Sequence, residues 1–319
     1  MTRSTKQTLI RAALETGGYG TQPAMTNTDA LLVSNPSHRI MRNLVDRDIW
    51  LPHLGATEQM VAARVSEIKF EVELAGSGAA GTAPAWGKLL RACGFAETVE
   101  ASRVEYNPIS EDFESLTFQY YRANVRYVAR GARGNAKLKL PAFGLPKIEF
   151  TFLAFDTAAG ASANNGSYDL SAWKRPEVLT DEMAGDIRIG CTFATGNVTG
   201  GTVLASRGLE LDAGNKVEHM ELLGGERISI TDRAATGKMS TALSAADEVA
   251  WRAEINTNTN VTLGFSWGTT AGNRGLIYAP RVQRIDPQGE DYKGDLLLAT
   301  DLRFQPTEAG HDDFVLVMK

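Results

Sequence analysis

The sequence predicts a mainly β protein with two sandwich-like or barrel-like β domains, each flanked by one short helix. Long segments alternate apolar and polar residues, which is typical of strands with one buried face. Helical spacing of apolar residues is confined to short segments. The two halves also present the same parts in the same order, although residue identity between them is negligible. Each has an alternating strand, a small-residue connection, one helix and a run of long strands. This order reflects either an ancient duplication or coincidence.

The composition is ordinary for a globular protein, with 43% of the 319 residues hydrophobic and 22% charged. At roughly 100–200 residues per domain, this length suits two domains or one large β domain. The formal charge of -5 argues against a strongly basic DNA-binding surface over the whole chain. The cysteines and histidines lack paired ligand spacing, so we expect no structural zinc and no cofactor. No run approaches the ~18–20 apolar residues of a membrane helix, so we expect no membrane anchoring.

Residues 1–60 are predicted to form an N-terminal arm and irregular segment. A short amphipathic helix is expected near residues 6–15, because Arg11 and Glu15 interrupt the apolar run. The same interruption argues against a signal peptide, so we expect a protein made and kept in a reducing cytoplasm.

A strand over 67–74 lies near the start of the first β domain, which is predicted to cover 61–156. One face of this strand is buried and carries Ile68, Phe70, Val72 and Leu74, whereas the wet face carries Glu67, Lys69, Glu71 and Glu73. A helix is expected next, since Pro84 suits a first turn and Gly94 the position just past the end. Its apolar stripe should pack on the sheet and consists of Trp86, Leu89, Leu90 and Cys93.

Further strands are expected along the rest of the chain. In the first domain they lie at 102–106, 115–130, 136–140 and 147–155. The small, polar, turn-rich residues of 157–190 predict a linker or long connection. The second β domain is expected over 191–319, with strands at about 202–211, 226–231, 259–267, 276–285, 295–304 and 313–318. Ser244 and Asp247 give an S-x-x-D start signal for a helix that continues to Ile255.

Gly76, Gly78 and Gly81 form a GxGxxG array between a strand and a helix, the layout of a dinucleotide-binding fingerprint. The charged face of the preceding strand differs from the buried first strand of a doubly wound sheet, and no strand–helix alternation follows. A phosphate loop is also disfavoured, because five residues separate Gly81 from Gly87. We therefore interpret the glycines as a pliable connection between strand and helix.

A second motif, GFSWG at 264–268, matches the GxSxG of serine hydrolases, and Asp286 and His311 follow in hydrolase order. A nucleophile elbow is a strand-to-helix turn. Ser266 instead lies within an alternating strand that is followed by a hairpin pattern. The sequence favours a solvent-facing strand serine.

A basic ribbon runs from Leu116 to Ile148, with seven basic residues and no acid. Arg122, Arg126 and Arg130 are expected on one strand face. An acidic stretch from Glu97 to Glu114 precedes the ribbon, with six acids and one arginine. The ribbon is either a phosphate-binding surface with stacking tyrosines or a strand face paired with acids of its own or a neighbouring subunit. The nearby acids favour the second interpretation.

Several motifs of the first half occur together in one known family. A strand ending in Gly-Ser-Gly leads to a Gly-Thr-x-Pro turn, then to "LLRACGF", "YNP" and a hairpin marked by "GARG". These motifs stand at 76–84, 89–95, 106–108 and 131–134. With the start "TLIRAALETGGYGTQPAMTNTDALLVSN", roughly residues 5–155 resemble the major tail tube proteins of long-tailed (siphovirus-type) bacteriophages. The second half is similar only in its general β character.

The resemblance implies tail-tube-like β-sandwich or barrel domains and a structural function in the virion tail. Such subunits form rings whose inner sheets join around a lumen, and the rings stack around a tape-measure protein and later conduct DNA into the host. The implied partners are further copies of the chain, the tape-measure protein, the tail terminator and baseplate proteins, and transiently passing double-stranded DNA. Assembly would take place in the host cytoplasm. One-domain members form hexameric rings, so three two-domain chains would supply six domains, and a trimer is favoured.

A lumen lined with arginine would hold DNA through salt-dependent contacts, so the ribbon is expected to face a neighbouring subunit, a neighbouring ring or the exterior. The candidate inter-subunit contacts are Arg122, Arg126, Arg130, Lys137 and Lys139. The candidate lumen-facing or charge-partner residues are Glu67, Glu71 and Glu73. No enzyme is expected. The alternatives are another tail ring protein, such as a terminator or baseplate protein, and, less favoured, a serine hydrolase.

Overall fold

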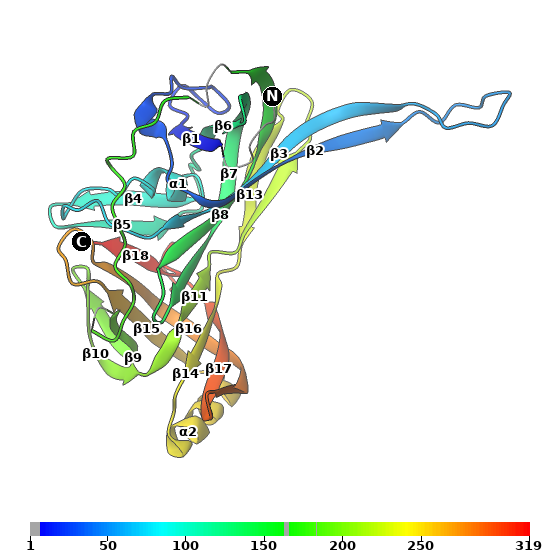
Figure 1. The fold of residues 1–319 in the computed structure, drawn as a ribbon. Coiled ribbons are helices and arrows are strands. Elements are labelled where there is room, and N and C mark those ends of the chain that lie inside the picture. The colour runs from blue at the N-terminus through cyan, green and yellow to red at the C-terminus, as the bar shows by residue number, and fades with distance from the viewer. Residues whose placement is uncertain (1–6, 163–165, 183) are drawn as a thin grey trace.

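A computed structural model describes residues 7–162, 166–182 and 184–319. Its first half is built almost entirely from antiparallel strands (Figure 1). The strands are β1 (Thr8–Leu14), β2 (Ser34–Asp46), β3 (Gln59–Glu73), β4 (Phe95–Glu100), β5 (Arg103–Pro108), β6 (Leu116–Arg122), β7 (Val125–Pro141) and β8 (Lys147–Ala161). A 3-10 turn, η1 (Asn27–Asp29), follows β1, and the short helix α1 (Gly87–Arg91) lies between β3 and β4.

The second half has the same character and contains the longer helix α2 (Ala245–Asn256). Its strands before the helix are β9 (Ala184–Ala194), β10 (Asn197–Leu204), β11 (Ser206–Asp212), β12 (Asn215–Met220), β13 (Arg227–Arg233) and β14 (Thr236–Thr241). After the helix come β15 (Asn260–Trp267), β16 (Gly275–Tyr292), β17 (Asp295–Phe304) and β18 (Val315–Met318). The predicted mainly β fold, with two helices in the described chain, is therefore confirmed.

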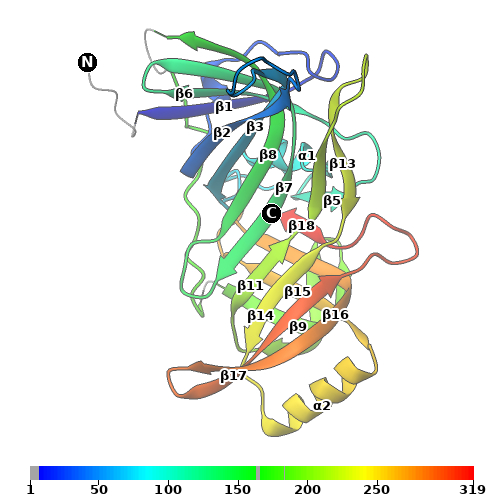
Figure 2. The same cartoon turned by 90° about the vertical axis from the view of Figure 1, so that its right-hand side faces the viewer.

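One sheet of 16 strands joins the two halves, along the path β10-β9-β15-β16-β17-β14-β11-β7-β8-β3-β2. The joint is the antiparallel pairing of β7 with β11, which runs from Lys137–Asp212 to Pro141–Gly208. Figure 2 shows these strands as one diagonal band that passes from the upper half of the molecule into the lower half. The hairpin β12–β13 forms a separate small sheet beside the band.

The core of the first half lies between two layers of strands. β7 is long enough to belong to both layers, because its first part pairs with β6 and its last part with β11. β6 therefore folds over the main sheet, and Phe118 contacts Phe70 and Phe152 with ring centroids 6.1 and 5.0 Å apart. All three rings are fully buried. This arrangement is a β-sandwich. The apolar face of the main sheet is covered by the second layer, and its opposite, polar face is left open.

The second helix, α2, begins where the sequence places it, whereas α1 begins at Gly87, three residues after Pro84. Ser244 caps α2 by accepting a hydrogen bond from the Asp247 backbone N–H at 3.2 Å. α1 is shorter than the predicted segment, and its packing residues Trp86, Leu89, Leu90 and Cys93 are all 1% exposed or less. The Trp86 indole N–H donates to the Ala75 carbonyl at 2.7 Å, which ties the helix to the end of β3.

The two halves share one strand order. Adjacent strands run β2-β3-β8-β7-β6-β1 in the first half and β11-β14-β17-β16-β15-β9 in the second. Each half also places its helix between the equivalent strands, α1 after β3 and α2 after β14. The irregularities in strand register also correspond. In the first half the pair Phe118–Ala129 is followed by Leu116–Ala132, and in the second half Leu263–Ala279 is followed by Val261–Val282. In both halves β7 or β16 therefore has one extra residue at the same place, which is called a register slip. The hairpin β12–β13 then corresponds to the outer part of the β2–β3 hairpin.

Two local predictions are wrong. The predicted helix near 6–15 is strand β1 from Thr8 onward, because pairing with β6 buries Ile10 and Ala12; residue 6 lies outside the described residues. The predicted strand 115–130 is a hairpin, because Ala123 and Asn124 adopt positive φ and form a two-residue turn.

The stretch predicted as a linker, 157–190, includes the end of β8 and the start of β9, while residues 163–165 and 183 lie outside the described part. Likewise, only residues 7–60 of the predicted N-terminal segment are described, and they contain β1 and β2. One buried cluster contains residues of both halves, including Phe70 and Phe304. The division into domains at 61–156 and 191–319 stays a prediction.

Candidate assembly surfaces

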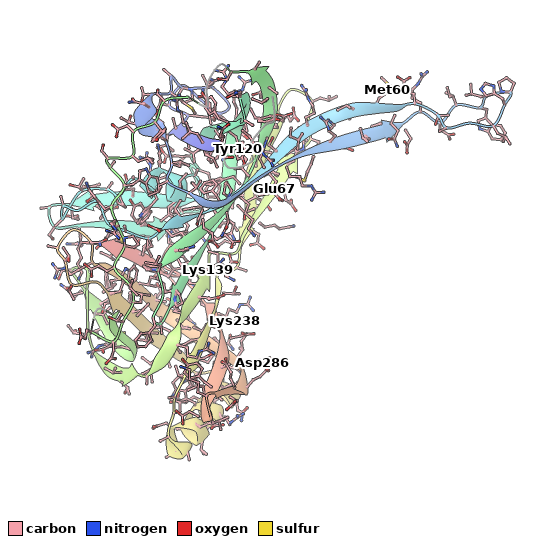
Figure 3. The ribbon with its side chains drawn as sticks, in the orientation of Figure 1. Met60, Glu67, Tyr120, Lys139, Lys238 and Asp286 are labelled. Atoms are coloured by element: carbon pink, nitrogen blue, oxygen red, sulfur yellow. The ribbon has the colours of Figure 1, made fainter. Side chains whose placement is uncertain are left out.

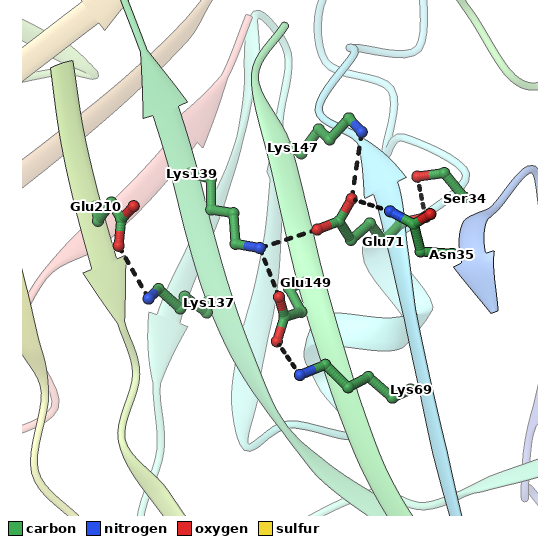
Figure 4. Close-up of polar contacts among 9 residues, drawn as sticks. All are labelled: Ser34, Asn35, Lys69, Glu71, Lys137, Lys139, Lys147, Glu149 and Glu210. Atoms are coloured by element: carbon green, nitrogen blue, oxygen red, sulfur yellow. Dashed lines mark hydrogen bonds and ion pairs between the residues drawn. The ribbon is translucent and has the colours of Figure 1, made fainter. Parts of the chain in front are cut away.

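A network of ion pairs covers the open polar face where β3, β8, β7 and β11 lie side by side (Figure 4). Lys139 Nζ lies 2.9 Å from Glu71 Oε1 and 2.6 Å from Glu149 Oε2. Lys147 Nζ also contacts Glu71, at 3.2 Å. At the joint of the two halves, Lys137 Nζ lies 2.9 Å from Glu210 Oε2. Each of these lysines therefore has a carboxylate partner.

The network shifts the titration of its members. The hydrogen bond from Lys139, together with that from Lys147, holds the pKa of Glu71 at about 2, below its usual value of 4.5. The hydrogen bonds to Glu149 and Glu71 raise the pKa of Lys139 from 10.5 to about 12. Burial raises the pKa of Glu149, but the hydrogen bonds from Lys139 and Lys69 outweigh it, so that pKa lies below its usual value. All three groups are charged near neutral pH.

The structure thus brings together two groups that the sequence analysis treated separately. Lys137 and Lys139 share the polar face with Glu67, Glu71 and Glu73, because the cross-strand registers align these positions. Figure 3 labels two of them, Glu67 and Lys139. Glu71 pairs with Lys139, whereas Glu67 and Glu73 are half-buried, and Glu73 stands opposite Lys147. The roles of these residues in assembly stay predictions.

The arginines of the basic ribbon do not share one strand face. Arg122 ends β6 and stands opposite Val125, while Arg126 lies on β7 opposite Tyr121. Cross-strand partners lie on the same face and successive residues alternate, so the hairpin places Arg122 and Arg126 on opposite faces. Arg130 lies at a register slip further along β7. The prediction failed because it read two strands and their turn as one strand.

Two glycines of the GxGxxG array, Gly76 and Gly78, form a close contact between the two halves. The Gly78 N–H donates to the Gly272 carbonyl at 3.0 Å, and the Gly76 N–H donates to Asn273 Oδ1 at 2.6 Å. A Cβ on Gly76 would lie 1.9 Å from the Gly272 oxygen, so that position has no room for a side chain. The glycines allow two backbones to touch. Sequence reasoning missed this partner, because the β15–β16 turn is far along the chain.

The residues of the GxSxG motif are held apart by the fold. Ser266 lies within β15 opposite Leu276, and Asp286 bonds Gln288 on the same strand. His311 Nδ1 lies 3.4 Å from Ser110 Oγ. In the part of the chain that the structure describes, no hydrogen bond joins these three side chains into a triad. That region also contains no cluster of three or more His, Cys, Asp or Glu residues placed to hold a metal ion.

A long arm, the outer part of the β2–β3 hairpin over 42–64, projects beyond the sheet (Figure 1). Its tip carries large apolar side chains in water: Trp50 is 96% exposed and Leu54 is 104% exposed. Further exposed apolar residues on the arm are Leu44, Val45, Ile49, Leu51, Met60 and Val61. Many large exposed apolar side chains on one segment are typical of an interaction site. Sequence reasoning treated most of this segment as irregular and did not identify it as an assembly surface.

One known protein family matches a range of residues that includes the arm, the strands of the polar face and most of both halves. The model of the family described as phage tail tube protein matches residues 5–306. The chain belongs to the phage tail tube protein family. The match extends far beyond the first half, where the motifs of the sequence resemblance lie. No curated protein matches the chain.

Family membership makes the chain a structural tail tube protein of the virion tail. Family membership also supports self-assembly with further copies and with other tail components. A tail tube protein has a structural, non-enzymatic role. Among the described residues of this tail tube protein, no helix is long and apolar enough to cross a membrane.

The stability of the tail tube protein is expected to fall as the pH drops from about 4.5 to about 2, partly through Glu71. The carboxylate has a lower pKa in the folded state than in the unfolded chain, so its contribution is present above 4.5 and is lost toward 2. Denaturant midpoints measured across this range check the effect. Glu71→Gln should unfold with a weaker dependence on pH, and an unchanged pH profile would contradict the importance of the network.

Proposed function

We propose that this tail tube protein forms rings that stack into a tube whose lumen conducts phage DNA into the host. The observation that carries the proposal is the repeated strand order of the two halves, which are joined edge to edge through β7 and β11. The eight strands from β2 to β16 form one curved band per chain. Three chains would place six equivalent units around an axis, so a trimeric ring is favoured over a hexamer.

We propose that the polar face of this band lines the lumen. The opposite face is covered by β6 and the sandwich core, so the polar face is the one left for water. Lys137 and Lys139 would then face the lumen, unlike the expectation from the sequence. Their charges are offset by Glu210, Glu71 and Glu149. Paired lysines contribute fewer free contacts to phosphate, which suits passage of DNA without retention.

The remaining partners follow from a tube. We propose a tape-measure protein inside the lumen during assembly in the host cytoplasm, and terminator and baseplate proteins at the two ends. Another tail ring protein is the second candidate, because a terminator or baseplate ring would share the sheet edges and the arm. A serine hydrolase is less supported, since the structure holds Ser266 apart from His311.

Electron microscopy of the purified protein in negative stain distinguishes these candidates. We expect long hollow filaments with a regular axial repeat, which form as the concentration rises. Single rings that never stack would favour a terminator or baseplate role. Labelling by a fluorophosphonate probe in the wild type, with loss of labelling in Ser266→Ala, would instead support the hydrolase.

A further inference from the structure

We propose that neighbouring chains of the ring join by β-strand addition between two specific edges. Ser37–Arg39 of β2 in one chain would pair antiparallel with Gln288–Glu290 of β16 in the next chain. The inference rests on the proposed ring and adds the strands, the register and the direction of the contact. The partner in this contact is a second copy of this chain.

Both edges are open in the chain. β2 pairs with β3 along one side, and within the described residues no strand pairs with its other side. The outer part of β16 pairs with β17 from Gln288–Ala299 to Tyr292–Asp295, and no described strand pairs with its opposite side. Open edges present unpaired N–H and C=O groups that accept another strand.

The joint between the halves supplies a template for this contact. β2 occupies the same place in the first half as β11 in the second, and β7 the same place as β16. Within one chain, β11 pairs with the outer part of β7. The equivalent pairing of β2 with the outer part of β16 is the one that a single chain leaves unmade. A second copy completes it and continues the band around the ring.

The registers of the two halves fix the expected partners on β16. The pair Arg133–Leu153 on β7 and β8 corresponds to the pair Gln283–Arg303 on β16 and β17. Arg133 and Gln283 are each the first residue after the equivalent register slip, which ends at Ala132 in β7 and at Val282 in β16. β16 then carries one extra residue at a second slip, near Asp286, which adopts φ 48°. Lys137 of β7 therefore corresponds to Gln288 of β16.

The same comparison fixes the partners on β2. Glu67–Leu153 in the first half corresponds to Thr236–Arg303 in the second. Arg39 pairs with Glu67 and Asp212 pairs with Thr236, so Arg39 corresponds to Asp212. Since Lys137 stands opposite Asp212 within the chain, Gln288 is expected opposite Arg39 of the next chain.

The charges on the two edges favour pairing of β2 with β16 over pairing of two identical edges. The β2 edge carries Arg39 and Arg42, while the outer part of β16 carries Asp286, Glu290 and Asp291. Glu290 already pairs with Arg207, so Asp286 and Asp291 supply much of the free negative charge. Two β2 edges, or two β16 edges, would bring like charges together. The favoured contact is therefore head-to-tail, which is the kind that closes rings.

The arm is also expected to contact the neighbouring chain. Its counterpart, the hairpin β12–β13, lies against the first half of its own chain: Arg133 donates to the Ile228 carbonyl at 3.0 Å, and Asn215 to the Cys93 carbonyl at 2.6 Å. By equivalence, the arm of one chain lies against the second half of the next. Exposed apolar residues are present there as well, namely Ile285, Tyr292, Leu296 and Val249.

Cysteine cross-linking of the full chain tests the register. Directly opposite residues have Cβ atoms roughly 4.5–5.5 Å apart, so a small approach of the strands brings them to the roughly 3.5–4.5 Å of a disulfide. Arg39→Cys combined with Gln288→Cys should give dimers and closed trimers on a denaturing gel without reductant. The equivalent pair within one chain, Lys137→Cys with Asp212→Cys, should cross-link without joining chains. Arg39→Cys with Asp301→Cys, on the same face but one strand further away, should give no cross-link.

Amide hydrogen exchange on the wild type provides a second measurement without substitutions. Assembly should slow exchange at least about tenfold at those amides of Ser37–Arg39 and Gln288–Glu290 that face the open edges, because they gain strand partners. The proposed pairing of β2 with β16 would be wrong if rings or tubes assemble without this protection and without the Arg39–Gln288 cross-link, while the internal pair does cross-link. The proposed function would still stand. A wild-type chain that stays monomeric at every concentration would contradict both.

Discussion

Replacing Trp50 and Leu54 together with serine is expected to leave the fold intact and to prevent tube formation. Both side chains lie fully in water in the single chain, at 96% and 104% exposure, so their loss removes no core packing. Burying each in a contact with another chain would contribute about 1.5–3 kcal/mol. Losing both would weaken each contact by about 3–6 kcal/mol, which is roughly a hundredfold or more in affinity.

Sedimentation across a concentration series measures this effect as the concentration at which filaments appear. A matched control is Leu223→Ser, since Leu223 is 106% exposed at the tip of the β12–β13 hairpin. That hairpin is already docked on its own chain, so the control should assemble like the wild type. If the arm variant forms tubes at the wild-type concentration, the arm is not an assembly surface.

Gly76→Val is expected to cause the largest loss of folding stability, more than about 3 kcal/mol. The new Cβ would lie 1.9 Å from the Gly272 oxygen, a backbone atom that cannot rotate away. The contact between the strand exit and the β15–β16 turn would have to open, and with it two hydrogen bonds between the halves. Chemical denaturation measures the change.

Two other glycines calibrate that result. Gly78 has φ 85°, and the atoms nearest to its Cβ would belong to the flexible Lys174 side chain, so Gly78→Ala should cost about 1–2 kcal/mol through backbone strain. Gly160 has open space around it, so Gly160→Val should change stability little. Equal denaturation midpoints for Gly76→Val and Gly160→Val would contradict the proposed role of the close contact.

The parts of the fold that were predictable from the sequence are those with a strong local pattern. The alternation at 67–74 identified β3, and the cap Ser244 identified the start of α2. The segment near 6–15 misled because Leu9, Ile10 and Ala12 suit an amphipathic helix as well as a strand. Pairing with β6, which is more than 100 residues away, decides between them.

The candidate assembly surfaces were harder to predict, because each depends on contacts between distant segments. Lys139 and Glu71 are ordinary strand residues until β7, β8 and β3 bring them within 2.9 Å. The partner of Gly76 lies in the other half of the chain. The arm lacks a buried face, so its residues show no clear alternation, and only its exposure in the fold marks it.

The symmetry of the assembled tube tests the central claim most directly. Reconstruction by cryo-electron microscopy would count the chains in each ring and show whether each chain contributes two equivalent units. We expect hollow, stacked rings of three chains with sixfold pseudosymmetry and an unbroken sheet around the lumen. Rings of six chains, or particles that do not stack around a lumen, would contradict it.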